Sequence, residues 1–383
     1  MSETLYGPSI VADTLNTSNV SISLDSLKQW PYLLPSTSNA ATITAGLTRL
    51  ANTYLNAQGG PFWSNLNSYS SIAAYSNYSG SVVLQDGRVV LAPDGGTNVG
   101  IFNPATNSLA TLSGITNVSY WYCGCALFPD GRVGVVPWNS NNIGIYNPVT
   151  NTWTTFSSVG GTQNYQYQGG CMSSNGLFVM APYRATNIGM YNPATNTFTT
   201  FSGVGSGSDY YNGAIPLPDG RIVFSPYTSG YLGIFNPVTL AFSSVSTSSA
   251  GGGYHGGVVI PDGRVVFCPL AITNIGIFNP LTNSFTTVLS GAFTGGYDGA
   301  VALPDGRVVF ISAGATNTGI FNPVTNSFTT ISGAPGANAF WGASLVPDGR
   351  IICTPRSSTT IGIISMSPSV PITYCLNPLF NKG

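Results

Sequence analysis

Charged side chains are scarce in this chain of 383 residues. Asp, Glu, Lys and Arg make up 6% of the sequence, where an average protein has about a quarter. Six of the 11 basic residues and six of the 12 acidic residues belong to one recurring Asp-Gly-Arg tripeptide, and the net charge is −1. No basic stripe remains that could contact a phosphate backbone, so we expect no nucleic-acid partner.

Long apolar runs and histidine are also missing. No apolar stretch approaches the roughly 20 residues of a membrane helix, and the first residues do not resemble a signal peptide. The only histidine is His255, and the pair Cys123 and Cys125 lacks both the spacing and the second pair of a zinc site. We therefore expect no membrane insertion, no metal and no other cofactor.

Repetition is what the sequence has in abundance. An Asp-Gly-Arg phrase followed by an apolar run occurs six times, and a worn seventh copy begins at Asn175. A second phrase, Gly-Ile-(Phe/Tyr)-Asn-Pro-x-Thr-Asn, follows the first six copies with small changes. The central glycines of the first phrase lie 43 to 45 residues apart: Gly87, Gly131, Gly176, Gly220, Gly263, Gly306 and Gly349. A period of this length indicates a repeat architecture.

The fifth copy shows what one repeat builds. Residues 254–288 contain four short runs rich in β-branched residues, which are typical of strands. Pro261-Asp262-Gly263 and Asn279-Pro280 are turn sequences between them. No copy has a helical period. We therefore predict an all-β fold, a seven-bladed β-propeller with four-stranded antiparallel blades.

The repeat phrases resemble the kelch repeat, above all at residues 147–153, Asn-Pro-Val-Thr-Asn-Thr-Trp. More loosely, they resemble the lyase-type propellers of the virginiamycin-inactivating family. The resemblance covers roughly residues 67–365, and it departs from kelch where a proline such as Pro137 or Pro182 replaces Gly-Gly after the second strand. It implies a kelch-like propeller of the kind seen in virus and phage structural proteins, and it says little about chemistry.

Closure of the ring can be predicted as well. The seventh copy degenerates after Ile363 and has no fourth strand of its own. Residues 67–72 match residues 326–331, so we expect an N-terminal strand to close the last blade and remove its open edge. The alternative is local closure by residues 372–374.

This division gives three segments: an N-terminal arm (1–66), the propeller (67–365) and a C-terminal tail (366–383). The arm is polar and irregular up to about residue 37, and apolar residues at helical spacing then predict one short helix over about residues 40–56. Because the arm exceeds what closure requires, we expect it to bind other structural proteins of a larger assembly. The alternative is that its helix packs on the flank of the propeller.

Strand order divides the loops between two faces. The Asp-Gly-Arg and Asn-Pro turns share one face, here called the turn face, and are nearly identical in every blade. The loops after the second and fourth strands share the other face, here called the loop face, and they differ between blades. Individuality, and with it any binding surface, therefore lies on the loop face.

A tripeptide enters the innermost strand of each blade from the loop face. Its first residue is aromatic in every blade: Tyr78, Tyr122, Tyr167, Tyr211, Tyr254, Tyr297 and Phe340. Its third residue is always Gly, which suits a close approach of backbones near the axis. Its middle residue varies and should ring the channel mouth: Ser79, Cys123, Gln168, Asn212, His255, Asp298 and Trp341.

Candidate binding residues come from these tripeptides. They are Tyr122, Gln168, Tyr211, Asn212, Tyr254, His255, Tyr297, Asp298, Phe340 and Trp341. The aromatic members have two explanations, packing between blades or a platform that stacks sugar rings.

Catalysis has one candidate pair. His255 and Asp298 occupy equivalent positions in neighbouring blades, and a His–carboxylate pair can transfer protons, with Ser79 and Cys123 as candidate nucleophiles. A hydrogen-bonded polar pair is the simpler explanation, so we assign no catalytic residue and expect no enzyme.

Three further charges, Asp94, Arg184 and Arg356, follow second-strand prolines and are expected to be solvated loop charges.

The expected surface is neutral and rich in Ser, Thr, Asn, Gly and Tyr, as in fibre, decoration and adhesion proteins of viruses and phages. We therefore expect a non-enzymatic structural or receptor-binding component of a virus or phage particle, located in the virion, with a glycan as candidate receptor. The alternatives are a carbohydrate-binding module and a hydrolase or lyase that uses the channel mouth. For location, the alternative is the cytoplasm.

Overall fold

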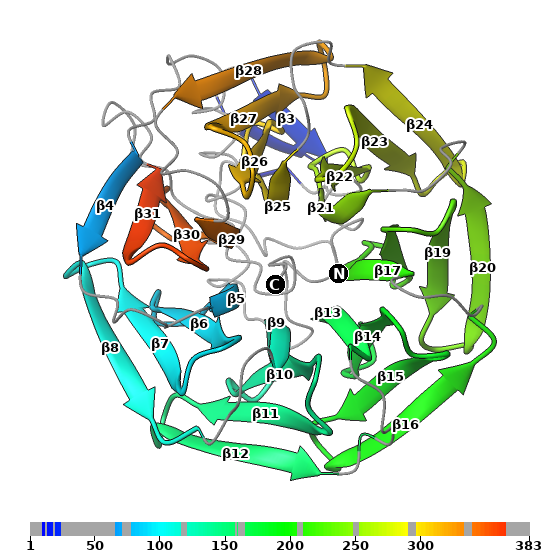
Figure 1. Ribbon diagram of the computed structural model, residues 1–383. Helices are drawn as coiled ribbons and strands as arrows, with labels where there is room; N and C mark the ends of the chain where they lie inside the picture. The colour runs from blue at the N-terminus through cyan, green and yellow to red at the C-terminus, as the bar shows by residue number, and fades with distance from the viewer. Residues whose placement is uncertain are drawn as a thin grey trace.

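The computed structural model describes residues 10–11, 14–17, 20–23, 66–70, 78–115, 121–157, 159, 165–204, 210–247, 253–289, 296–332 and 339–364. Seven four-stranded antiparallel sheets form a closed ring around a central axis (Figure 1). The predicted all-β class, the seven blades and their four antiparallel strands are confirmed, and none of the residues described is helical.

Each blade runs outward from the axis. The innermost strands are β5 (Tyr78–Val83), β9 (Tyr122–Leu127), β13 (Tyr167–Met172), β17 (Tyr211–Pro216), β21 (Tyr254–Val259), β25 (Tyr297–Ala302) and β29 (Phe340–Leu345). The second strands are β6 (Val89–Pro93), β10 (Val133–Pro137), β14 (Phe178–Pro182), β18 (Ile222–Pro226), β22 (Val265–Pro269), β26 (Val308–Ser312) and β30 (Ile351–Pro355). The third strands are β7 (Asn98–Asn103), β11 (Asn142–Asn147), β15 (Asn187–Asn192), β19 (Tyr231–Asn236), β23 (Asn274–Asn279), β27 (Asn317–Asn322) and β31 (Thr360–Ile364). The outer strands are β8 (Ser108–Ser113), β12 (Thr152–Ser157), β16 (Thr197–Ser202), β20 (Ala241–Ser246), β24 (Ser284–Leu289), β28 (Ser327–Ser332) and β4 (Leu66–Ser70).

The seventh blade is closed by the N-terminal strand β4, as predicted (Figure 1). The predicted register is wrong by three residues. Tyr69 pairs with Ile361, so it occupies the position of Ile331 in the sixth blade and not that of Phe328. No tight turn joins β4 to its partner β31, so the short-loop geometry that fixes register in a hairpin is missing here.

The N-terminal arm contains three short strands, β1 (Ile10–Val11), β2 (Thr14–Thr17) and β3 (Val20–Ser23), which pair as one antiparallel sheet. The expectation of irregular structure there is wrong. Leu15 pairs in register with Ile10 and with Ile22, and apolar cross-strand pairs of this kind favour a sheet. The predicted helix over residues 40–56, the tail and the alternative closing segment 372–374 lie outside the described residues.

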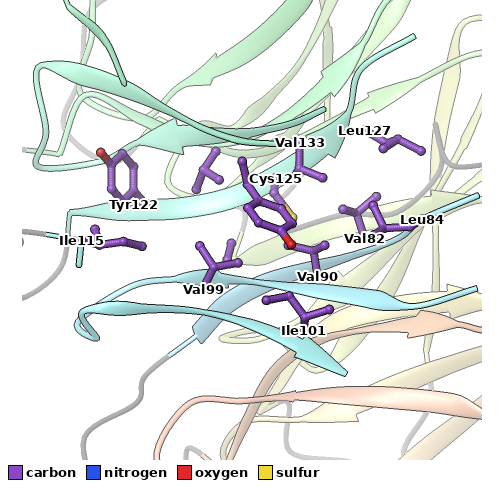
Figure 2. Close-up of a cluster of buried hydrophobic side chains, with 13 residues drawn as sticks. Val82, Leu84, Val90, Val99, Ile101, Ile115, Tyr122, Cys125, Leu127 and Val133 are labelled. Carbon is purple, nitrogen blue, oxygen red and sulfur yellow. The ribbon is translucent and has the colours of Figure 1, made fainter. Parts of the chain in front are cut away.

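The hydrophobic core lies between neighbouring blades. Between the first two blades, for example, Val82, Val90 and Ile101 pack with Tyr122 and Leu127 (Figure 2). The inner strands are buried along nearly their whole length because both of their faces meet other blades, whereas the outer strands alternate between partly buried and exposed residues. Each blade is therefore stable only as part of the ring.

The Asp-Gly-Arg phrase clamps neighbouring blades together on the turn face. Asp130 Oδ2 accepts a hydrogen bond from Arg132 Nη2 at 2.6 Å, and the same nitrogen donates to the Pro193 carbonyl of the next blade at 2.8 Å. In the worn third copy, Asn175 Nδ2 donates to the Pro237 carbonyl at 3.1 Å and replaces the missing arginine. Most charged residues of the protein thus serve its architecture.

Candidate binding site on the loop face

A β-bulge opens each innermost strand and sets the direction of the variable residue. In the fifth blade the pairing of β21 with β22 shifts between Tyr254 and Gly257, where Gly256 has a φ of 62°. A Cβ added to Gly169 would lie 2.7 Å from the Cα of Gly213 in the next blade. The predicted close approach of backbones is therefore confirmed, and only glycine fits there.

The aromatic residues of the tripeptides are buried in the blades. The members of this ring, Tyr78, Tyr122, Tyr167, Tyr211, Tyr254, Tyr297 and Phe340, are at most 2% exposed. The Tyr297 hydroxyl donates to Asn317 Oδ1 at 2.5 Å, and burial raises the pKa of Tyr297 to about 12. This burial favours the packing explanation for Tyr122, Tyr211, Tyr254, Tyr297 and Phe340.

Three of the variable residues form a polar chain at the channel mouth. His255 Nδ1 lies 2.8 Å from Asp298 Oδ1, and His255 Nε2 contacts Asn212 Nδ2. All three side chains are at most 5% exposed. The structure therefore brings together the two residues expected to touch, and it adds Asn212 on the far side of the imidazole.

This chain uses both ring nitrogens of His255. With the Nδ1 proton directed at the Asp298 carboxylate, Nε2 carries the lone pair and accepts from the Asn212 amide. A general base needs that lone pair to reach the proton it removes. In this arrangement a substrate would first have to displace Asn212, so the geometry fits a structural polar chain better than a catalytic base.

Trp341 caps the axis on the loop face. Its ring is nearly parallel to that of His255, with an interplanar angle of 8° and centroids 6.3 Å apart, and its centroid lies 6.4 Å from that of Trp138. His255 belongs to the fifth blade and Trp138 to the second, on opposite sides of the ring. An indole that reaches both therefore lies over the channel.

The remaining variable residues line the same mouth. Ser79 Oγ donates to the Tyr122 carbonyl at 2.9 Å, which links the first two blades. Cys123 is buried, and so is Gln168, whose Oε1 has no hydrogen-bond partner among the described residues. The predicted nucleophiles Ser79 and Cys123 are thus separate from the His255 chain.

A second variable ring was missed in the sequence analysis. The residues that directly follow the second strands are Asp94, Trp138, Tyr183, Tyr227, Leu270, Ala313 and Arg356. Backbone hydrogen bonds tie this ring together from blade to blade; for example, Gln166 N donates to Trp138 O and Tyr183 N donates to Gln166 O, both at 2.9 Å. Comparing this position across the repeats, as was done for the tripeptide, would have revealed it.

Three blades place aromatic side chains on this second ring. Trp138 lies 4.9 Å from Tyr165 and 6.5 Å from Tyr183, measured between ring centroids. Tyr183 stacks on Tyr227 at 6.1 Å, and Tyr227 meets the edge of His255 at 5.2 Å. We call Tyr165, Trp138, Tyr183 and Tyr227 the aromatic track; all four are partly exposed.

The expectation that Asp94 and Arg356 are solvated loop charges is wrong. Asp94 is fully buried, and its burial raises the pKa of the carboxyl to about 7 although the charge of Arg356 acts in the opposite direction. Arg356 stacks over Trp341, its Cζ 3.6 Å from the ring centroid. Arg184 is exposed as expected, and its Cζ lies 4.7 Å from the Tyr165 ring. Stacking on the facing indole, rather than solvation, fixes Arg356.

Other functional groups are few in the described part of the chain. No three His, Cys, Asp or Glu side chains come together there as a metal site, and no helix there could span a membrane. The five described cysteines are buried and unpaired, and burial raises the pKa of both Cys125 and Cys353 to about 12. Such thiols are poor nucleophiles.

No protein-family model matches the chain, and no curated protein matches it in sequence. In three dimensions it is similar to a streptogramin B lyase, with a TM-score of 0.70 and 16% identity over 79% of this chain and 98% of that one. It is also similar to virginiamycin B lyase from Staphylococcus aureus, with a TM-score of 0.69 and 15% identity over 80% of this chain and 100% of that one. A third similar structure is the extracellular domain of a hybrid two-component system from B. thetaiotaomicron, with a TM-score of 0.59 and 12% identity over 79% of this chain and 40% of that one.

These identities show a shared fold and no more. The looser resemblance to lyase-type propellers holds at the level of architecture, and the kelch and viral resemblances are not confirmed. The chain is a seven-bladed β-propeller whose blades resemble those of the streptogramin lyases in three dimensions.

Proposed function

We propose that this protein is a non-enzymatic binding propeller that holds a saccharide on its loop face. The aromatic track carries the proposal: partly exposed rings from three consecutive blades lie in contact beside a polar channel mouth. Sugar rings offer apolar C–H faces to aromatic side chains and hydroxyls to amides and carboxylates. Aromatic walls with a few polar groups are the usual composition of small-molecule sites.

Two further observations support a surface built for binding. Tyr165 has a φ of 66°, a left-handed conformation that a bulky residue rarely adopts, and Asn139 Oδ1 accepts a hydrogen bond from its backbone N at 2.9 Å. Such strain collects where function requires a fixed side chain. On the opposite half of the loop face, Leu270 and Ala313 hold the positions that Trp138 and Tyr183 hold on the track. The binding half is therefore one-sided.

The proposal is tested with the full chain on a glycan array, followed by titration calorimetry with the strongest neutral oligosaccharide found. Tyr183→Ala and Tyr227→Ala should each weaken binding by about tenfold, since a stacked ring contributes roughly 1 kcal/mol or more. Tyr231 is 51% exposed and lies outside the track, so Tyr231→Ala is the matched control. The proposal fails if no glycan binds, or if the control loses as much affinity as the track variants.

A hydrolase or lyase is the second candidate. The contact between His255 and Asp298, together with a fold shared with lyases, supports it, and the position of Asn212 weighs against it. His255→Gln should leave glycan binding within about twofold while lowering stability by roughly 1–3 kcal/mol, because the buried Asp298 loses a partner. A turnover on the bound glycan that this substitution abolishes would replace the binding proposal with an enzymatic one.

We place this binding propeller in a virus or phage particle, as a decoration, fibre or tail component. Low charge and a surface rich in hydroxyl and amide groups support the placement, as does an arm longer than ring closure requires. Purification of native particles followed by mass spectrometry is the test. Recovery of the chain only outside particles would contradict the placement and leave the binding proposal intact.

A further inference from the structure

Outside the Asp-Gly-Arg clamps, the described residues include only four Asp, Glu, Lys or Arg side chains: Asp94, Arg184, Asp298 and Arg356. All four belong to the loop face. Asp298 contacts His255, and Arg184 stacks on Tyr165 at one end of the aromatic track. In a protein with so little charge, this concentration marks the loop face as the place where charge is used for something other than architecture.

Arg356 covers one face of Trp341. Its Cζ lies 3.6 Å from the ring centroid, while the indole itself is only 8% exposed. The arginine is partly exposed and sits on a long, flexible side chain, so it can leave the ring without moving the backbone. The flat surface beneath it has the size and character of a saccharide-stacking platform, and it adjoins the aromatic track through Trp138.

Asp94 is an acceptor without a donor. Its side chain is fully buried, and neither carboxylate oxygen has a hydrogen-bond partner among the described residues. Arg356 is the charged residue whose field acts on it. A buried, unsatisfied carboxylate is costly, and a guanidinium is the side chain that best satisfies two carboxylate oxygens at once.

We propose that the Trp341 face under Arg356 is a saccharide subsite, and that Arg356 moves from Trp341 to Asp94 when a sugar ring takes its place. This inference rests on the proposed function and names the subsite and its ligand class. The exchange compensates for itself: the indole loses a cation–π contact and gains a sugar ring, while Asp94 gains the donor it lacks. No covalent step is involved.

The charge left near the subsite selects the ligand. Once Arg356 and Asp94 pair, their charges cancel, and the nearest remaining charged side chain is Asp298, which reaches the Trp341 ring through His255. A carboxylated sugar such as a sialic acid would be repelled by it. The subsite therefore favours neutral saccharides, in which each hydroxyl can both donate and accept.

A double-mutant cycle tests the exchange. Affinity for the strongest neutral array glycan is measured by calorimetry for the full chain, for Asp94→Asn, for Arg356→Ala and for the double variant. Asp94→Asn should weaken binding about tenfold in the native background, because the displaced arginine loses a charged acceptor. In the Arg356→Ala background, where the indole is already bare, Asp94→Asn should change affinity by less than about twofold.

A second readout separates this role from a structural one. Asp94→Asn should unfold at a higher temperature than the native chain, since an unpartnered carboxylate is removed, while its glycan affinity falls. A purely structural aspartate would lose stability instead, and that result overturns the inference. Equal affinity losses in both backgrounds would mean that Asp94 touches the sugar itself, and they would overturn the exchange.

The sialylated form of the same glycan is the matched ligand. It should bind the native chain at least about tenfold more weakly than the neutral form. Equal or tighter binding overturns the ligand class. If no glycan binds the native chain, the proposed function and the subsite fail together; if Tyr183→Ala weakens binding but the cycle shows no coupling, the subsite alone fails.

Discussion

At the scale of single residues, burial decides which charges matter. The anchor residue Asp86 is half exposed, and although burial raises its pKa, hydrogen bonds from Arg88 outweigh that effect and hold the pKa below its ordinary value. Asp94, eight residues later, is fully buried and its pKa rises to about 7. The same side chain thus stabilises the fold in one place and destabilises it in the other.

Asp94 should make stability fall as the pH rises. Between about pH 4 and pH 7 the native carboxyl keeps a proton that the unfolded chain has already lost, so the free energy of unfolding decreases across this window. Asp94→Asn removes the effect: we expect little change near pH 4 and a gain approaching the order of 4 kcal/mol near pH 8. Urea unfolding at both pH values measures it. Asp86→Asn is the control, and it should show no such gain.

At the scale of strands and turns, each blade is held to the next by a repeated clamp. Arg221 is its clearest example, with Nη2 donating to the Pro280 carbonyl and Nη1 to Asn283 Oδ1, both at 2.7 Å. In the fifth blade, Arg264 Nη2 reaches the Pro323 carbonyl only at 3.4 Å. These bonds explain why the Asp-Gly-Arg and Asn-Pro phrases recur together: one donates to the other across a blade boundary.

The clamps should therefore differ in strength. Arg221→Ala should lower the free energy of unfolding by about 1–2 kcal/mol, since two charged hydrogen bonds are lost at a partly buried position. Arg264→Ala should cost less than about 1 kcal/mol because its bond is long. Thermal and urea unfolding of the two variants, side by side, measure the difference. Equal losses would show that the clamp acts through its local Asp–Arg pair rather than across the boundary.

At the scale of the whole molecule, one short strand makes the ring continuous. β4 supplies the outer strand of the seventh blade and covers the edge of β31. Removal of that strand leaves unpaired backbone groups at β31, and an exposed edge of this kind promotes aggregation.

Two truncations separate the strand from the rest of the arm. Deletion of residues 1–73 should give an aggregated or unfolded product, whereas deletion of residues 1–65 keeps β4 and should give a soluble ring. Size-exclusion chromatography and circular-dichroism melting distinguish the two outcomes. A soluble, cooperatively melting 1–73 deletion would show that the ring closes in another way.

The fold could be predicted because it is written in local repeats. Turn residues and short apolar strands recur every 43 to 45 residues, and each copy repeats the same local instruction, so the blade count and the closing strand followed from the sequence alone. The ring of variable residues and the pairing of His255 with Asp298 also followed, because equivalent positions in neighbouring blades must be near each other.

Packing across the ring settled what no single repeat contains. Trp341 reaches the second and fifth blades, and Arg356 lies on its indole instead of in water. Burial of Asp94 and the register of β4 likewise depend on partners far away in the chain. The sequence by itself determined the architecture and which positions vary between blades. Only the tertiary structure decided which variable side chains meet, because distances across the axis depend on all seven blades together and on side-chain size at positions that the repeat leaves free.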